Sequence, residues 1–242
     1  MISRKQLVTI LLVTTLGVLI YLAPKMSSAS KVEEKDPGDI TASFEEAMKN
    51  ATEDQKNIFG RLQQGLIKAQ QDNSEASWLS SADDFLKGAR FITDDKKAAL
   101  YKSAISGFEK ALELNPNNLS AKTSLGAALV ESSSLLGNQP MKGISLLREV
   151  IQKDSNNVEA NIQLGLFSVT SQQFDKAIER FTRVLRIDST HIDMYVFLGE
   201  TYTTMGNKEK AIESFENYKS HVTDSLIIKS IEEHIKKLKQ QP

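Results

Sequence analysis

A spacing of 34 residues recurs in the C-terminal half of the chain and constrains its fold more than any other feature. Three landmarks return after this interval: Leu164-Gly165 at Leu198-Gly199, Ala177 at Ala211, and Phe181 at Phe215. Landmarks of three residue types that share one period indicate a structural unit repeated along the chain. One unit of this length cannot bury its apolar face alone, so neighbouring units are expected to stack around a continuous core.

Each repeated unit is predicted to contain two amphipathic helices. In the second half of one unit the apolar residues recur three and four apart, which is the helical period. They are Phe174, Ala177, Ile178, Phe181, Val184 and Leu185. Gly165 and Ala177 lack bulk where the two helices would cross, and Phe181 would fill the interface with the next unit. A related unit begins 39 residues earlier at Leu125-Gly126, with its five extra residues between Ser132 and Asn138.

The period and its landmarks resemble the tetratricopeptide repeat. The signature positions are Leu125, Gly126, Leu164, Gly165, Ala177, Phe181, Tyr195, Leu198, Gly199, Tyr202, Ala211 and Phe215. The resemblance covers about residues 76–219 and implies an all-α fold, an α-solenoid of tetratricopeptide-type helix hairpins. About four units are expected in residues 76–222, at 76–118, 119–157, 158–191 and 192–222.

Amphipathic segments flank the repeats on both sides. Residues 223–242 contain an apolar stripe opposite Lys and Glu residues and are expected to form a C-terminal capping helix. Within residues 41–75, the stretch 41–70 is predicted to be one long helix. Its apolar stripe has two interpretations: a coiled coil that makes an oligomer, or an N-terminal cap on the first repeat. The cap is favoured because Gln55 and two alanines weaken a coiled-coil seam.

The N-terminus carries an uncharged apolar run from Leu7 to Ala23, preceded by Arg4 and Lys5. As a helix these 17 residues would span about 26 Å, the short end of what crosses a bilayer core. Residues 1–25 are therefore expected to be an uncleaved signal anchor, with a cleavable signal peptide ending near residues 27–29 as the alternative. The positive-inside rule places the rest of the chain outside the cytoplasm. Residues 26–40 are polar and are expected to be a flexible linker.

The sequence contains no recognisable catalytic or metal-binding motif. There are no cysteines, and His191, His221 and His234 do not form a ligand pattern. Neither a phosphate-binding glycine loop nor a nucleophile elbow occurs. Beyond residue 25 the chain has 27 basic and 31 acidic residues, which argues against a nucleic-acid partner. We therefore expect a non-enzymatic protein without a metal or other cofactor.

In tetratricopeptide domains the first helices of successive repeats line a binding groove, and the resemblance transfers that role by position. The predicted groove residues are Thr123, Ala127, Val130, Glu159, Ile162, Leu166, Asp193, Val196 and Glu200. These positions lack the Lys, Arg and Asn residues with which some repeats hold a C-terminal carboxylate. Apolar centres with acidic edges favour an amphipathic helix or an extended segment with some basic residues.

Together these features predict a membrane-tethered scaffold that binds a protein or peptide. The repeat domain would be extracytoplasmic, and periplasmic in a bacterium; after signal cleavage it would instead be an exported soluble protein. One anchor followed by about four repeats is similar to the envelope repeat modules that help assemble c-type cytochromes. The alternatives are a structural protein that self-assembles through residues 41–70, an accessory subunit of an enzyme, and a receptor on a eukaryotic organelle membrane.

Overall fold

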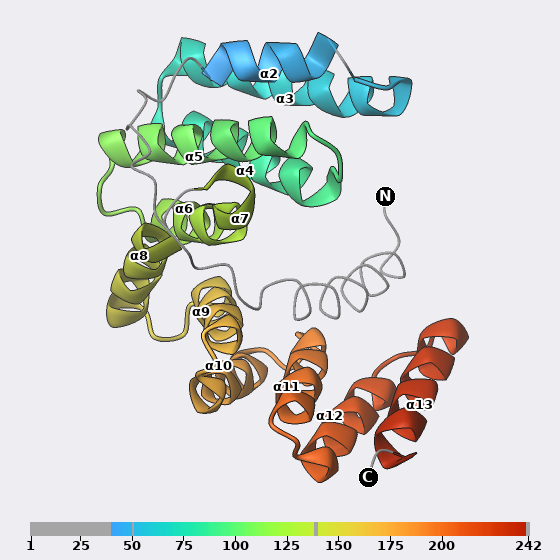
Figure 1. Cartoon of the computed structure of the whole chain (residues 1–242). Helices are drawn as coiled ribbons and strands as arrows, with labels where there is room; N and C mark the ends of the chain where they lie inside the picture. The colour runs from blue at the N-terminus through green and yellow to red at the C-terminus, as the bar shows by residue number, and fades with distance from the viewer. Residues whose placement is uncertain (1–39, 50, 138–139, 241–242) are drawn as a thin grey trace. The chain divides into compact units, whose positions relative to one another are not determined.

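The structure is a computed structural model that describes residues 40–49, 51–137 and 140–240 (Figure 1). All regular secondary structure in these ranges is helical, which confirms the predicted all-α fold. The expected anchor, residues 1–25, and the expected linker up to residue 39 lie outside the described residues. None of the helices described is both long enough and apolar enough to cross a membrane.

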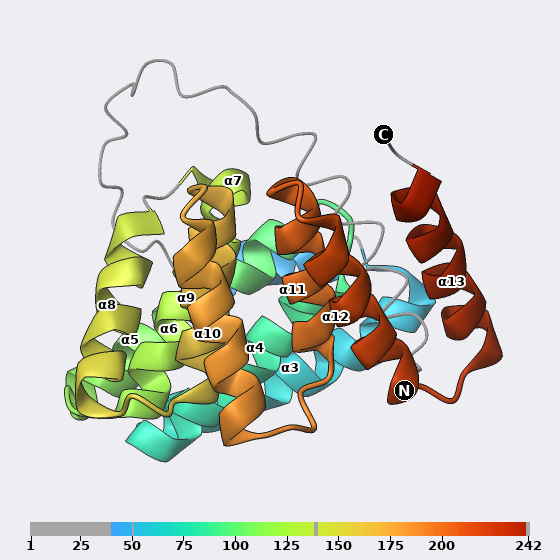
Figure 2. The ribbon, with the colours of Figure 1, turned by 90° about the horizontal axis from the view of Figure 1, so that it is seen from below.

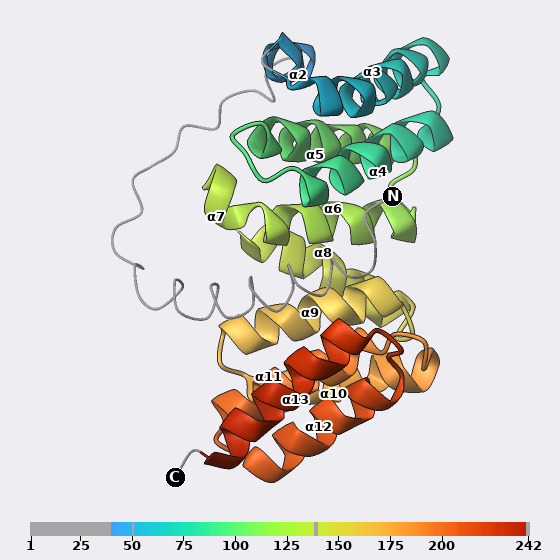
Figure 3. The ribbon, with the colours of Figure 1, turned by 90° about the vertical axis from the view of Figure 1, so that its right-hand side faces the viewer.

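The chain forms two compact units that divide between Gln163 and Leu164. The helices of the N-terminal unit are α2 (Ile40–Lys49), α3 (Glu53–Asp72), α4 (Glu75–Phe91), α5 (Lys97–Leu114), α6 (Leu119–Glu131), α7 (Ser133–Leu136) and α8 (Pro140–Lys153), followed by the start of α9 (Val158–Thr170). Helices α4 and α5 pair as one hairpin, and α6 pairs with α8 as the next. Figure 3 shows α2 and α3 as a further layer on the first hairpin, with α3 against α4 and α2 against α5.

The predicted single helix over residues 41–70 is wrong, because two helices occupy this stretch. Helix α2 ends at Lys49 and α3 begins at Glu53. At the new start the Gln55 side chain accepts a hydrogen bond from the Thr52 backbone N–H at 3.1 Å, as in a capping box. This side chain also donates to Asp94, 2.8 Å away beyond α4. Gln55 therefore begins a helix at a point where the apolar period alone indicates continuity.

The apolar stripe of residues 41–70 packs within its own unit. Phe44 lies in α2, and its ring contacts those of Phe59 and Phe85 edge to face, with centroids 5.8 and 4.9 Å apart. Leu62 and Leu66 of α3 are buried in the same core. The stripe is thus an N-terminal cap on the first hairpin, as the favoured interpretation predicted.

The lengthened connection of the second hairpin contains the one-turn helix α7 between the two helices of the hairpin. Gly137 ends this turn with a φ of 66°, a left-handed conformation that glycine adopts without steric cost. The flanking helices still cross closely, because a Cβ added to Gly126 would lie only 2.7 Å from Leu147. The insertion therefore lengthens the connection between α6 and α8 without separating these two helices where they cross.

The C-terminal unit continues α9 and adds four helices: α10 (Phe174–Ile187), α11 (Asp193–Thr204), α12 (Lys208–Ser220) and α13 (Ser225–Gln240). A Cβ on Gly165 would lie 2.5 Å from the Phe181 ring, so this glycine permits the close approach of α9 and α10. Phe181 is fully buried, and its ring stacks on that of Phe197 in α11 at 5.3 Å. The predicted roles of the glycine and the phenylalanine are confirmed.

The last helix closes the C-terminal core. Figure 2 shows α11, α12 and α13 following one another in sequence, and α13 packs against α12. Its buried side chains Ile231, Ile235 and Leu238 share one cluster with Val196 and Phe215 of the last repeat. Residues 225–240 are therefore the predicted capping helix. Both units consist of the predicted tetratricopeptide-type hairpins, with α2 and α3 capping the N-terminal unit and α13 capping the C-terminal unit.

Candidate protein-binding surface

The predicted groove residues of the N-terminal unit lie on α6 and at the start of α9, and they differ in accessibility. Thr123 and Ala127 are buried, and the Thr123 hydroxyl donates internally to the Leu119 carbonyl at 2.7 Å. Val130, Glu159 and Ile162 are partly exposed. Only these last three offer side-chain surface to another protein.

The predicted groove residues of the C-terminal unit divide in the same way. Leu166 on α9 and Asp193 on α11 are partly exposed. Val196 is buried in the C-terminal core, and Glu200 is 9% exposed. The predicted groove residues of this unit therefore also lie at different depths, because contacts with neighbouring helices decide which of their side chains are accessible.

An ion-pair network that the sequence did not indicate ties together three first helices of the N-terminal unit. Arg90, in the last turn of α4, donates from Nε and Nη2 to both carboxylate oxygens of Glu131 on α6, at 3.0 and 2.7 Å. Its Nη2 also lies 3.1 Å from Glu159 on α9. Bidentate pairing of a guanidinium with a carboxylate is strong and directional. The network therefore fixes the ends of α4 and α6 against the start of α9.

Two neutral side chains complete this network. The Tyr101 hydroxyl on α5 donates to Glu131 at 3.1 Å, and Gln163 donates to Glu131 and Glu159 at 2.8 and 3.0 Å. Burial, together with the charge of Glu131, raises the pKa of Tyr101. Burial alone would lower the pKa of Arg90, but the hydrogen bonds and charges of Glu131 and Glu159 outweigh it and raise that pKa. The tyrosine thus stays protonated and the arginine stays charged.

The network leaves the surface with more acid than base. One guanidinium is shared by two carboxylates, so Arg90 is already paired and unsuited to binding a partner's carboxylate. Asp83 on α4 is a further carboxylate on this side, where it accepts a hydrogen bond from Ser124 of α6 at 3.1 Å. Burial raises the pKa of Asp83, because loss of water disfavours its charged form. A cation from another molecule would relieve that cost.

Sequence spacing could not have revealed this network. Arg90 lies 41 residues from Glu131 and 69 from Glu159, and α4 belongs to the least regular repeat. One feature of the sequence could have indicated the pair. Arg90 and Glu131 both lie at the C-terminal ends of first helices, and parallel neighbouring helices place such ends side by side.

Replacing Arg90 by alanine is expected to lower the free energy of unfolding by about 1–2 kcal/mol, because it leaves Glu131 partly buried without its cation. Urea denaturation followed by circular dichroism measures this change. Lys87→Ala is the matched control on the same helix, since Lys87 and its partner Asp84 are both well exposed, and its effect should stay within about 0.5 kcal/mol. Equal effects of the two substitutions would contradict a structural role for the network.

The three histidines have separate neighbours in the C-terminal unit. His191 is 3.5 Å from Asp188, His221 contacts the Asn217 carbonyl, and His234 lies against the Phe215 ring. Across the described ranges, no group of three or more His, Asp or Glu side chains is placed to hold a metal ion.

Comparison with known proteins identifies the repeats. A family model for the tetratricopeptide domain of cytochrome c-type biogenesis protein H matches residues 97–195, and a general tetratricopeptide repeat model matches residues 192–218. No curated protein sequence matches the chain. These matches confirm tetratricopeptide repeats in both units.

Solved structures share the fold at low sequence identity. The crystal structure of YrrB, described as a tetratricopeptide protein with an unusual peptide-binding site, is 20% identical and has a TM-score of 0.53, covering 82% of this chain and all of YrrB. MamA from Desulfovibrio magneticus RS-1, from residue 41 to its end, is 18% identical with a TM-score of 0.54, covering 76% of this chain and 96% of that one. At these identities the similarity concerns the fold.

Proposed function

We propose that this protein is a scaffold that binds a peptide or helix of another protein on the first-helix faces of its repeats. The observation that carries the proposal is that apolar side chains on these helices are partly exposed, Val130 on α6 and Ile162 and Leu166 on α9, and that α9 also carries the partly exposed carboxylate of Glu159. Tetratricopeptide hairpins present such faces, and YrrB, which shares the fold, is described as having a peptide-binding site.

The chemistry of the surface favours a partner with apolar anchors and basic residues. The apolar residues would bury the partner's anchors. Glu159 shares the guanidinium of Arg90 with Glu131. Within the described residues, Asp83 accepts a hydrogen bond from a hydroxyl, and no cation lies within hydrogen-bond distance of it. A lysine or arginine of the bound segment would pair with these carboxylates.

We further propose that the scaffold is tethered to a membrane by residues 7–23, with the repeats on the extracytoplasmic side, which is the periplasm in a bacterium. The uncharged run behind Arg4 and Lys5 supports this orientation. The family match over residues 97–195 supports a role in assembling an envelope complex such as the cytochrome c maturation machinery. An exported soluble protein, produced by cleavage near residues 27–29, is the alternative, and membrane fractionation with carbonate extraction separates the two.

The binding surface is tested by quantitative affinity capture from membranes with the full chain. Ile162→Glu and Leu166→Glu place charge on partly exposed positions and are expected to reduce capture of the bound protein at least about tenfold. Ile187→Glu is the matched control, because Ile187 is exposed on α10, a second helix, and should retain capture. Unchanged capture by both first-helix variants, with normal circular dichroism, would contradict the proposed surface.

Val196 is unsuitable for this test although it belongs to the predicted groove. Its side chain is buried with α13, so Val196→Glu would place a charge in the core and unfold this region. Loss of capture would then report on folding rather than on binding.

A further inference from the structure

Two buried polar atoms lie close to each other between the last repeat and its capping helix. Glu200 on α11 and His234 on α13 approach to 3.9 Å between Oε1 and Nε2. Neither of these two atoms has a hydrogen-bond partner within the described part of the chain. Buried polar atoms without partners are costly and uncommon in folded proteins, so this pair requires a physical explanation.

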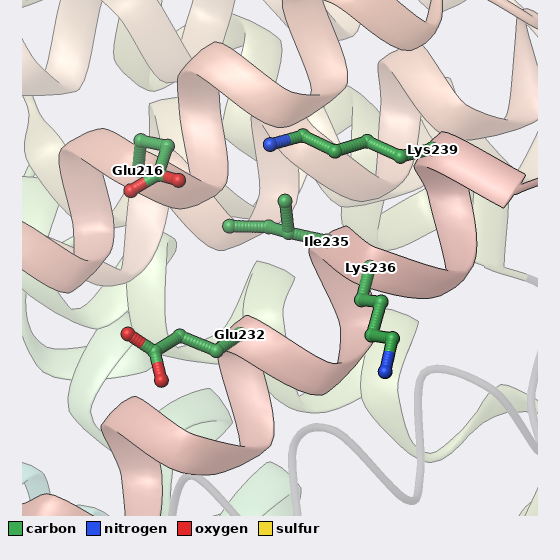
Figure 4. Close-up of a pocket in the computed structure, with 5 residues that line it drawn as sticks. All are labelled: Glu216, Glu232, Ile235, Lys236 and Lys239. Atoms are coloured by element: carbon green, nitrogen blue, oxygen red, sulfur yellow. The ribbon is translucent and has the colours of Figure 1, made fainter.

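The charged groups around the pair do not neutralise it. On α12, Glu216 binds Lys219 at 2.7 Å, and Lys219 also lies 3.6 Å from Glu232 of α13. Figure 4 shows a pocket between α12 and α13, lined by Glu216, Glu232, Ile235, Lys236 and Lys239. Lys237 of α13 acts on His234 by charge repulsion, and Phe215 of α12 contributes only its ring, 4.7 Å from the imidazole.

Proton binding at the two groups changes the stability of this interface in a defined direction. Burial raises the pKa of Glu200 above its ordinary 4.5, so its contribution favours the docked helix at low pH and is lost as the pH rises through the raised value. Burial and Lys237 lower the pKa of His234 below 6.5, so its contribution is lost as the pH falls through the lowered value. The two contributions oppose each other as the pH changes. Glu200 is the more deeply buried of the pair, with 11% of its side chain exposed against 25% for His234, so the cost of its buried charge dominates and docking weakens toward alkaline pH.

We propose that the Glu200–His234 pair makes α13 a proton-sensitive latch on the last repeat. With one proton on the pair, either Glu200 is neutral or its charge faces a protonated His234, and the two atoms can join in a hydrogen bond. With no proton, an unpaired carboxylate remains buried under α13, which favours release of the helix. The latch does not depend on which partner the repeats bind.

Release of α13 would uncover part of the last repeat. Val196 and Glu200, two positions predicted to line the groove, lie in or beside the cluster that Ile231, Ile235 and Leu238 complete. The latch therefore couples the accessible surface of α11 to proton concentration.

Hydrogen–deuterium exchange of the full chain between pH 5 and pH 8 tests the latch, with rates corrected for the intrinsic pH dependence. We expect protection of the α13 amides to fall roughly three- to tenfold over this range, while α10 amides keep their protection. Glu200→Gln should retain α13 protection at both pH values. Glu233→Gln, which changes an exposed carboxylate of α13, should behave as the unmodified protein does.

Two outcomes would overturn the proposal. One is α13 protection in the unmodified protein that is the same at both pH values. The other is a fall in Glu200→Gln as large as that in the unmodified protein. Protection of α10 in every variant shows that the unit is folded, so neither outcome can be attributed to general unfolding.

Discussion

Phe181→Ala is expected to lower the free energy of unfolding by about 3–5 kcal/mol, the cost of removing a large aromatic side chain from a packed core. Phe181 is fully buried. It fills the space above Gly165 within its own hairpin and stacks on Phe197 of the next repeat. The substitution therefore removes contacts inside one hairpin and between two hairpins. In a chain of this length each kcal/mol lowers the melting temperature by about 2–4 °C.

The matched control is Phe91→Ala, which removes the same side chain from the end of α4, where it is 47% exposed. Its effect should stay below about 1 kcal/mol, since a half-exposed ring loses less burial and leaves no cavity. Thermal and urea unfolding of both variants provide the comparison. A loss for Phe181→Ala no greater than that for Phe91→Ala would show that the stacking of hairpins does not depend on this residue.

Gly199→Ala is expected to destabilise the protein by about 1–3 kcal/mol, although alanine ordinarily favours a helix over glycine. A Cβ at this position would lie 2.7, 2.8 and 2.9 Å from three atoms of the Phe215 ring. Phe215 is fully buried and touches His234 on its other side, so the ring has little room to move. The helices α11 and α12 would have to separate.

Gly60→Ala makes the same chemical change in α3 with the opposite expected sign. A Cβ there meets no atom within 4 Å, so only the helix propensity of alanine remains, and the protein should gain about 0.4–1 kcal/mol. Urea denaturation of the two variants measures both changes. Destabilisation by both substitutions would mean that the close crossing at Gly199 is not the cause.

The hairpins themselves could be predicted from the sequence because their packing repeats. Gly165 and Gly199 meet Phe181 and Phe215 in the same way, so one spatial requirement appears twice in the chain at a fixed interval. The caps could also be predicted, since α13 shows a clear apolar stripe. When the same packing is repeated, the same residue types recur at a regular spacing in the sequence.

The features that could not be predicted depend on contacts that do not recur from one repeat to the next. The start of α3 is set by Gln55, whose side chain bonds both Thr52 and Asp94. The Arg90–Glu131 pair joins an irregular repeat to a lengthened one. Val196 is buried because of α13, a helix outside the repeats. Each of these features depends on a contact with a residue distant in sequence. Such a contact cannot be identified from a single sequence.

The burial of the predicted groove residues could not be read from the repeat pattern. Ile162 and Leu166 are accessible, whereas Thr123 and Ala127 on α6 are buried. The repeat pattern specifies which side of a helix is turned toward the groove. How deeply a residue lies there depends on the size of the side chains on adjacent helices.

Helix α7 has a consequence for the engineering and divergence of such chains. It lies in the lengthened connection of this hairpin, while Gly126 and Leu147 remain in close approach across α6 and α8. The connection between the two helices of a hairpin is thus separable from the interface that they form. A reporter module or affinity tag is best inserted at the exposed Ser134 and Leu135, where a change of length is already accommodated. Homologous chains should accumulate insertions at this turn, while the tight crossings stay fixed in length.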